Sequence, residues 1–483
     1  MKHPKQSRFT LIVFLVAAVL IGWNRLAKSS AEENIIIIST SDIHAKIDMM
    51  PRLAAFVAEA RAQDTARVFL VDAGDRWTGN AYVDMATHAG RPIIELMNEL
   101  EYDVATFGNH EFDMGLDTLQ KRVEDAKFPI VLANVNTGST PLKQPKPYVI
   151  KEANGVKVGF LGIVTNYANG HPDGDDPVYV GTEFFSPEWT AEKYAKRLRR
   201  QCDVMVVISH CGLDRDTTNV SGAFPQADVI ISGHTHETFS GKAGDVAVVQ
   251  GTNKLKAVGV TTLKVAGGKV VDINTKYMDL PKVEDEALKS RLDGYYNNPF
   301  LTEAIGTLTK TATKTGLAQM MADEGRRVAG TDLGFYHIGG TRLHSLEAGD
   351  VTRADIYELE PFQSYLAITT MTLEEIKQMV INKFNDTTNY KESHREDLIP
   401  SGLAYDIVTD AKGDAVDVIF RPEVEKELYT VAMSDYVYGN KVYAYPRRPE
   451  TGRTPLVTQY LIELFGRGEF TPDNDESRVR IIK

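Results

Sequence analysis

The stretch Gly108-Asn109-His110-Glu111-Phe112-Asp113-Met114-Gly115 decides how the first half of this sequence is interpreted. It follows an apolar run at residues 104–107 that predicts a short buried strand. It precedes residues 116–126, whose apolar period predicts a helix. In α/β proteins, a polar turn between a strand and a helix lies at the carboxyl edge of the sheet, where functional sites are found.

Three side chains of this stretch are candidates for chemistry. Asn109 and His110 are adjacent, so they point in different directions from the turn, one toward a metal and the other toward a substrate. Asp113 follows His110 by three residues and can reach back to fix the tautomer and orientation of its ring. The structural alternative is a polar turn capped by Asn and Asp, which are common turn residues.

Four further apolar runs end in the same way, in turns that carry Asp or His. They lie at residues 35–38, 68–71, 204–208 and 229–231, and each is too short for a helix and therefore predicts a buried strand. If all five strand ends converge on one edge of a sheet, they bring together seven side chains. These are Asp42, His44, Asp75, Asn109, His210, His234 and His236.

Seven such side chains exceed the needs of one four-coordinate ion and suit two ions that share a carboxylate, for which Asp75 is the candidate. The mixture of imidazole, carboxylate and amide groups fits zinc, manganese or iron better than calcium, which prefers oxygen ligands alone. Two ions roughly 3.5–4 Å apart recur in enzymes that displace a group at phosphorus. The pattern therefore predicts two divalent ions and phosphoryl chemistry.

The remaining patterns outline an α/β chain. Further helices are predicted at residues 51–61, 92–100, 187–200, 283–296 and 316–328. Residues 166–187 are typical of a loop. Further strands are predicted at residues 130–133, 156–164, 246–250, 258–265 and 270–277, with Gly267-Gly268 as a hairpin turn.

Length, charge and cysteines limit the class of protein. A chain of 483 residues exceeds what one core usually supports, so two domains are expected. The net charge of −12 argues against a nucleic-acid polymer as the partner, because phosphate backbones need a basic surface. The two cysteines, Cys202 and Cys211, are interpreted as separate thiols, with a disulfide or a metal-bound Cys211 as the alternatives.

The N-terminus predicts export to the periplasm or the extracellular space. Lys2, Lys5 and Arg8 precede a mostly apolar run at residues 9–23, which is short for a spanning helix and typical of a secretory signal. Residues 27–31 offer small side chains at which a signal peptidase could cleave. The alternative is an uncleaved N-terminal anchor, which is the only membrane attachment that the sequence predicts.

Taken in order, the motifs Asp42-x-His44, Gly74-Asp75, Gly108-Asn109-His110-Glu111, His210 and Gly233-His234-x-His236 resemble the calcineurin-like metallophosphoesterases. The fuller form through Gly115 resembles their 5′-nucleotidase/UDP-sugar hydrolase branch. The resemblance implies an α/β chain with a four-layer α-β-β-α metallophosphoesterase domain and a smaller α/β C-terminal substrate-binding domain of the 5′-nucleotidase type. The boundaries expected are 1–31 for the signal or anchor, 32–281 for the first domain, 282–305 for a linker helix and 306–483 for the second domain.

The resemblance also implies a role for each candidate. His110 and Asp113 would form the dyad that stabilises the transition state and assists the leaving group, and Asn109 would also hold the substrate phosphate. One metal would be bound by Asp42, His44, Asp75 and His236. The other would be bound by Asp75, Asn109, His210 and His234.

The second half resembles the C-terminal domain of the same nucleotidases through Gly339-Gly340-Thr341-Arg342 and the later Pro361-Phe362. Arg342 matches the arginine that contacts substrate in that family, and its planar, permanently charged fork suits a phosphate or carboxylate. A surface arginine in an ordinary ion pair is the alternative.

The substrate pocket departs from the family pattern. The family usually has Asn at position 337, where this chain has His337, and neither the Gly-Gly-Asp-Gly turn nor a second clamping aromatic before Ser401 is present. Tyr436 matches the expected aromatic, so it is a candidate substrate contact. Because Tyr436, Tyr438 and Tyr443 are also spaced like strand residues, we interpret them as part of a half-buried sheet.

The sequence therefore predicts an exported phosphohydrolase in which water activated by two metals attacks the phosphorus of a small phosphate ester, by resemblance a nucleotide. Other hydrolases of this scaffold are alternatives, namely a 2′,3′-cyclic phosphodiesterase/UDP-sugar hydrolase or a thiosulfohydrolase-like enzyme. A non-catalytic binding protein on the same fold is disfavoured because it need not retain His110 and Asp113 beside every ligand.

Overall fold

The structure is a computed structural model, and the segment expected to direct export, residues 1–31, lies outside its described residues. Within the described part, no helix combines the length and the apolar character needed to cross a membrane. The described residues are 32–63, 66–166, 170–174, 176–388, 393–421 and 426–483.

The N-terminal part of the chain, strands β1 to β13, contains two large sheets. Strands β1, β2 and β3 of the first sheet run parallel, so their carboxyl ends lie at the same edge. The five strands, in sheet order, are β13 (Lys269–Asp279), β12 (Ala257–Ala266), β1 (Glu33–Thr40), β2 (Arg67–Asp72) and β3 (Val104–Ala105).

The second sheet has six strands, and its central strands β6, β8 and β9 also run parallel. In sheet order they are β10 (Phe239–Ala243), β11 (Val246–Gln250), β9 (Val229–Ile231), β8 (Val204–His210), β6 (Val156–Val164) and β5 (Tyr148–Ala153). A separate short ladder joins β4 (Val135–Asn136) to β7 (Glu183–Phe184).

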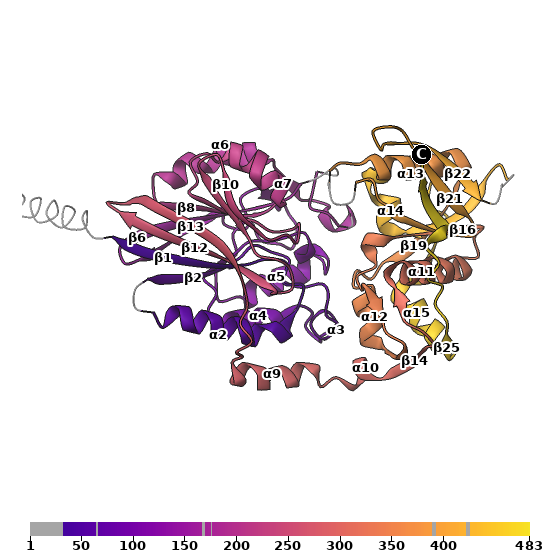
Figure 1. Cartoon of the computed structure of the whole chain (residues 1–483), viewed down its shortest axis with the longest axis horizontal. Helices are drawn as coiled ribbons and strands as arrows, with labels where there is room; N and C mark the ends of the chain where they lie inside the picture. The colour runs from indigo at the N-terminus through magenta and orange to yellow at the C-terminus, as the bar shows by residue number, and fades with distance from the viewer. Residues whose placement is uncertain (1–31, 64–65, 167–169, 175, 389–392, 422–425) are drawn as a thin grey trace, which may run out of the picture.

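The two sheets pack face to face between two helical layers, which gives the predicted four-layer α/β architecture (Figure 1). The isoleucines of β1 alternate: Ile35 and Ile37 pack between the sheets, whereas Ile38 faces the first helical layer. Both faces of β1 are therefore buried, which is why its sequence is apolar throughout. The main helices are α2 (Met50–Arg61), α4 (Arg91–Glu99) and α5 (Leu116–Asp125) on the first sheet and α6 (Pro187–Arg199) on the second.

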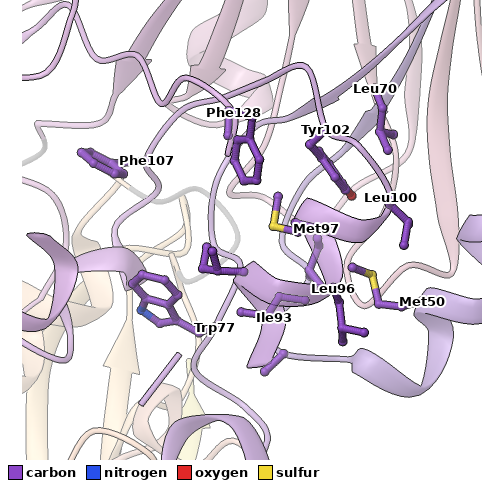
Figure 2. Packing of buried hydrophobic residues seen from close by; sticks show 14 of the residues in the cluster. Met50, Leu70, Trp77, Ile93, Leu96, Met97, Leu100, Tyr102, Phe107 and Phe128 are labelled. Atoms are coloured by element: carbon purple, nitrogen blue, oxygen red, sulfur yellow. The ribbon is translucent and has the colours of Figure 1, made fainter. Parts of the chain in front are cut away.

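The packing of the first helical layer fixes the loops that carry the candidate site. Figure 2 shows Ile93, Leu96 and Met97 of α4 in the same apolar cluster as Trp77 and Phe107. Trp77 and Phe107 come from the loops after β2 and β3, so the core anchors these loops directly beside their polar residues.

Two expectations about this part are wrong. Residues 130–133 form isolated bridges rather than a strand, because their backbone bonds are divided between Ala105 of one sheet, Gly162 of the other and Lys146. The five polar strand ends also do not share one sheet: β1, β2 and β3 belong to the first sheet, and β8 and β9 belong to the second. The ends still meet, because the sheets face each other.

The C-terminal part, strands β14 to β26, is built around a mixed five-stranded sheet (Figure 1). In sheet order its strands are β20 (Leu398–Ser401), β16 (Leu333–His337), β23 (Tyr429–Ser434), β19 (Tyr365–Met371) and β24 (Gly452–Leu456). Smaller sheets contain β22 (Ala415–Arg421), β21 (Ala404–Thr409) and β26 (Val479–Ile482), then β18 (Gly349–Thr352), β14 (Ala304–Leu308) and β25 (Glu469–Phe470), and finally β15 (Ala312–Thr313) and β17 (Ser345–Leu346).

Helix α9 (Glu286–Tyr296) and the short α10 (Pro299–Thr302) connect the two parts, as Figure 1 shows. Asp285 caps α9 by accepting a hydrogen bond from the backbone N–H of Leu288, which explains where the helix begins. The other helices of the C-terminal part are α11 (Lys314–Ala329), α12 (Arg353–Leu359), α13 (Leu373–Asn385), α14 (Asp435–Gly439) and α15 (Val457–Phe465).

Candidate metal centre and active site

The loops that follow the five strand ends have an unusual backbone. The left-handed region of φ is uncommon for residues other than glycine, and it clusters at functional sites because it costs conformational energy. Five of the seven candidate ligands adopt it. They are Asp42 (φ 52°), His44 (φ 46°), Asp75 (φ 58°), His234 (φ 83°) and His236 (φ 58°).

Two glycines allow these loops to approach each other. A Cβ atom on Gly74 would lie 2.3 Å from the backbone nitrogen of Gly108, and one on Gly108 would lie 2.1 Å from Asp75 Oδ1. Both distances are far below van der Waals contact, so neither position accepts a larger residue while the loops stay together. The glycines before Asp75 and Asn109 are thus part of the geometry of the site.

The structure brings the candidate ligands into overlapping groups whose ligand atoms lie within 4.8 Å of one another. Asp75 belongs to two of these groups. Its Oδ2 lies 3.1 Å from His210 Nε2, and Asn109 Oδ1 lies 3.0 Å from His234 Nδ1. The groups are Asp42 with His44 and His236, Asp75 with His44 and His110, and Asp75 with His210 and His234.

The rear nitrogens of three histidines are held by hydrogen-bonding partners, which turns the opposite nitrogen toward the cluster. His44 Nδ1 lies 3.0 Å from the carbonyl of Thr78, and His210 Nδ1 lies 2.7 Å from the carbonyl of Ala73. His236 Nδ1 lies 3.1 Å from the Asn253 amide nitrogen. Partners of this kind orient metal-binding imidazoles in known sites.

Two observations show that this set of residues fits metal ions. The Nε2 atom of His210 is buried and, although Asp75 is close, makes no well-aligned hydrogen bond, which is costly unless another group binds it. His44 Nε2 and His236 Nε2 also lie 3.0 Å apart, a spacing at which two such nitrogens suit a shared cation.

The charge states agree with this fit. Burial lowers the pKa of His44 and His236 well below the ordinary value, with a further contribution from neighbouring cationic groups. Burial and the neighbouring His210 lower the pKa of His234 to about 3. These three rings are therefore neutral at physiological pH, the form in which imidazole binds metals.

His210 differs from these three because carboxylates surround it. Burial lowers its pKa, but the charge of Asp75 and a smaller contribution from Asp42 outweigh burial and raise the pKa to about 10. A proton on His210 thus balances the carboxylates of the metal-free site. A divalent cation held by the same carboxylates would supply this balance with more charge, in place of that proton.

His110 and Asp113 form a hydrogen-bonded pair beside the candidate ligands. His110 Nδ1 lies 2.7 Å from Asp113 Oδ2, which also accepts a bond from the Thr78 hydroxyl at 2.9 Å. Burial lowers the pKa of His110, but Asp113 and Asp75 raise it above the ordinary value overall. The pair can therefore present a charged imidazole to a phosphate group.

Glu111 lies within residues 108–115 and is central to the site, although the sequence pattern predicts no role for it. Its carboxylate is fully buried and accepts hydrogen bonds from the backbone N–H groups of Gly108, Asp75 and Arg76. It therefore fastens the turn after β3 to the turn after β2. The repeated polar strand ends revealed the ligands, whereas nothing in that pattern distinguishes a residue that binds backbone.

A cavity of about 440 Å³ extends from the candidate ligands to the C-terminal part. Asp75, Asn109, His110, His234 and His236 line one end of it. The C-terminal part contributes Lys314, His337, Arg342, Phe362, Asp397, Asp435, Tyr436 and Tyr443, among others. A larger cavity of about 570 Å³ contains none of the candidate ligands.

The structure places Arg342 and Tyr436 in this cavity and corrects one interpretation. The Arg342 guanidinium lies 5.6 Å from the centre of the Phe362 ring, which stacks beside His110. The expectation that Tyr436, Tyr438 and Tyr443 alternate along a strand is wrong: the first two lie in helix α14 and the third in a 3-10 turn. Ser434 caps α14 through its side chain, and this local bond overrides the strand spacing.

Cys202 and Cys211 are two separate buried thiols, as expected. Burial raises the pKa of both thiols, so neither is a ready thiolate ligand. Cys211 belongs to none of the ligand groups found in the described residues.

Two family profiles match the chain. The calcineurin-like phosphoesterase profile matches residues 35–238, and the profile of the 5′-nucleotidase C-terminal domain matches residues 299–446. The chain belongs to the 5′-nucleotidase family of calcineurin-like metallophosphoesterases.

Curated relatives are similar over most of the chain. Endonuclease YhcR of Bacillus subtilis is 26% identical over 400 residues, which cover 71% of this chain and 32% of YhcR. Protein 5NUC of Lutzomyia longipalpis is 27% identical over 393 residues, which cover 72% of this chain and 65% of 5NUC. The matched region therefore spans less than two thirds of either relative.

A solved structure shares the fold over nearly its whole length. The 5′-nucleotidase precursor from Thermus thermophilus superposes with a TM-score of 0.77 at 21% identity, covering 93% of this chain and 99% of that one. Both the four-layer part and the C-terminal part therefore match one known arrangement.

Proposed function

We propose that this protein is an exported phosphohydrolase that binds two divalent metal ions and releases phosphate from a nucleotide or a related small phosphate ester. The observation that carries the proposal is the convergence of the candidate ligands beside the His110–Asp113 pair. Asp75, Asn109, His234 and His236 line one end of a cavity, and Asp42, His44 and His210 belong to the same ligand groups behind that lining. The other end of that cavity is formed by the C-terminal part, so it has room for the group to which the phosphate is attached.

Each ion would have its own set of ligands, with Asp75 shared. Asp42, His44, Asp75 and His236 would bind one ion, and Asp75, Asn109, His210 and His234 would bind the other. Imidazole nitrogens mixed with oxygen ligands favour zinc, manganese or iron. Such ions supply Lewis acidity and lower the pKa of coordinated water when they are bound.

The residues around these ligands would bind and orient the phosphate. His110 carries a raised pKa, so its protonated ring can donate to a phosphoryl oxygen and then to the departing oxygen of the ester. Asp113 holds that ring through Nδ1, and Nε2 lies 3.9 Å from Asp75 Oδ2, on the side of the candidate ligands where the phosphate would bind. The amide of Asn109 would add a hydrogen bond to a phosphoryl oxygen, and the guanidinium of Arg342 would contact oxygens of the group to which the phosphate is attached.

The basic and apolar segments at residues 2–23 support export, with residues 1–31 acting as a signal or an anchor. We also propose residues 32–281 and 306–483 as the two domains, joined through 282–305. The break between the sheets of the N-terminal part and those of the C-terminal part supports this division.

The test is turnover of a generic aryl phosphate by metal-loaded protein, followed by a substrate panel. The panel holds nucleoside monophosphates, 2′,3′-cyclic nucleotides, UDP-sugars, sugar phosphates and a sulfur ester. Metal-dependent phosphate release that chelation abolishes supports the proposal. Metal binding without turnover of any ester would instead indicate a binding protein, and activity on the sulfur ester alone would indicate a thiosulfohydrolase.

A further inference from the structure

The far end of the cavity, away from the candidate ligands, contains a stack of aromatic side chains. The His337 ring lies parallel to Tyr436, with the ring centres 4.6 Å apart and an angle of 19° between their planes. The His337 ring also stacks with Tyr336, with the ring centres 5.3 Å apart and an angle of 27° between their planes. The imidazole therefore contacts both phenol rings, of which Tyr436 lines the cavity.

The backbone holds His337 in this stack. A Cβ atom on Gly340 would lie 2.5 Å from His337 Cε1, so the chain turns tightly around the ring. His337 Nδ1 lies 3.1 Å from the buried Ser434 hydroxyl, and only 7% of the residue is exposed. Moving the ring away from Tyr436 would break this bond and expose apolar surface.

Tyr436 is fixed as well. Its hydroxyl donates to Asp173 Oδ1 at 2.9 Å, which ties the ring to the N-terminal part of the chain. Tyr443 approaches it almost perpendicularly, at 81° with the centres 6.2 Å apart. Carbon atoms pack about 3.5–4.0 Å apart, so a planar base between two rings needs them about 7–8 Å apart. The His337–Tyr436 pair leaves no such gap.

Three carboxylates lie around this stack. Asp397 accepts a hydrogen bond from the Tyr443 hydroxyl at 2.6 Å, and Asp435 and Asp173 line the same end of the cavity. An ionised carboxylate offers about four acceptor positions, so one bond does not exhaust it. Sugar hydroxyls are donors that match such acceptors.

We propose that His337 is a specificity-determining residue that prevents stacking of a nucleobase on Tyr436, so that the enzyme selects phosphate esters by a hydroxyl-rich sugar group. This inference rests on the proposed phosphohydrolase function. Under it, ribose 5-phosphate and a nucleoside monophosphate are equivalent substrates, because the base adds nothing to binding. An ester of similar size without hydroxyls is a poor substrate.

The experiment compares kcat/KM of metal-loaded protein for four esters: ribose 5-phosphate, a purine nucleoside monophosphate, cyclopentylmethyl phosphate and an aryl phosphate. In the unaltered protein we expect the first two to agree within about threefold and cyclopentylmethyl phosphate to be at least about tenfold poorer. Two results would overturn the inference. One is equal kcat/KM for ribose 5-phosphate and cyclopentylmethyl phosphate, and the other is a tenfold preference for the purine nucleoside monophosphate over ribose 5-phosphate. Failure to hydrolyse even the aryl phosphate would overturn the proposed function itself.

Substitution tests the role of His337 directly. His337→Ala should expose Tyr436 and raise the preference for the purine ester over ribose 5-phosphate by about five- to hundredfold, the effect of stacking one base. The double variant His337→Ala/Tyr436→Leu should lose that gain. His88→Ala removes an exposed histidine outside the cavity and should leave every ratio unchanged. An unchanged ratio of the two kcat/KM values in folded His337→Ala would contradict the role assigned to His337. If that variant does not fold, His337→Asn repeats the test, because it retains a polar group toward Ser434.

Discussion

The two ends of the cavity differ in what holds their side chains in place. At the metal end, backbone loops after five strands place each ligand, and five of these residues sit in left-handed conformations. At the far end, contacts between side chains add to the turn at Gly340, as in the contact of His337 with Tyr436 and the bond from Tyr436 to Asp173. The positions of the candidate ligands therefore depend on the backbone of the fold, whereas the far end depends in part on individual side-chain contacts that one substitution can remove.

The comparison of the two ends predicts that substitution of a candidate metal ligand abolishes phosphate release. Because Asp75 would be shared by both ions, Asp75→Asn should lose metal and reduce kcat/KM for an aryl phosphate by about a thousandfold or more. Elemental analysis and a steady-state assay on the same preparation measure both effects. Full metal content in Asp75→Asn would contradict the bridging role.

A neighbouring substitution separates metal binding from turnover. His110→Asn should retain the metals, since His110 is placed beside the ions as an acid, and should lower kcat by about a hundredfold to ten-thousandfold. Its circular dichroism spectrum and metal content serve as controls. Metal loss equal to that of Asp75→Asn would show that His110 is itself a ligand.

Arg342 lies between the two ends, so its substitution should have an intermediate effect. Arg342→Ala should raise KM for a nucleoside monophosphate or a sugar phosphate by about tenfold, because a charge-assisted contact to the substrate is lost. An aryl phosphate should change little, because its leaving group has no hydroxyl or further phosphate oxygen for the guanidinium to contact. Arg447→Ala removes an exposed arginine outside the cavity lining and is the matched control. An equal loss on the aryl phosphate would place Arg342 in the catalytic centre.

The smallest expected effect concerns the stability of the pocket wall. Burial raises the pKa of Glu360, next to Pro361 and Phe362, from 4.5 to about 8. Between pH 4.5 and about 8, the folded protein keeps the proton on Glu360 while the unfolded chain releases it. The contribution of this proton to the free energy of unfolding is therefore complete below pH 4.5 and is lost as the pH rises toward 8.

Glu360→Gln should therefore flatten the decline of Tm over this window. We expect the drop between pH 5 and pH 8.5 to be smaller in the variant by about 2–4 °C or more. Glu469→Gln changes an exposed carboxyl in strand β25 and should follow the unaltered protein. Parallel curves for all three proteins, measured by calorimetry, would mean that Glu360 is charged in the folded state.

The same contrast explains which features the sequence could predict. Asp42, His44, Asp75, Asn109, His210, His234 and His236 were found because each follows an apolar strand, and a strand fixes where its end points. The apolar runs do not show that these strands are divided between two sheets, because a buried strand has the same apolar sequence in either sheet. The four-layer fold class was implied by the resemblance alone.

The contacts at the far end could not be predicted in this way. Tyr436 and Tyr443 have strand-like spacing, but the Ser434 cap starts a helix there. The stack of His337 on Tyr436 joins residues from β16 and α14, and no local pattern connects them. Glu111 was missed for a related reason, because its partners are backbone N–H groups of another loop.

The most direct test of the metal centre is an anomalous-scattering map from crystals grown with manganese or zinc. The proposed assignment predicts two peaks with Asp75 between them, one beside Asp42, His44 and His236 and the other beside Asn109, His210 and His234. A single peak, or ions bound away from Asp75, would contradict it.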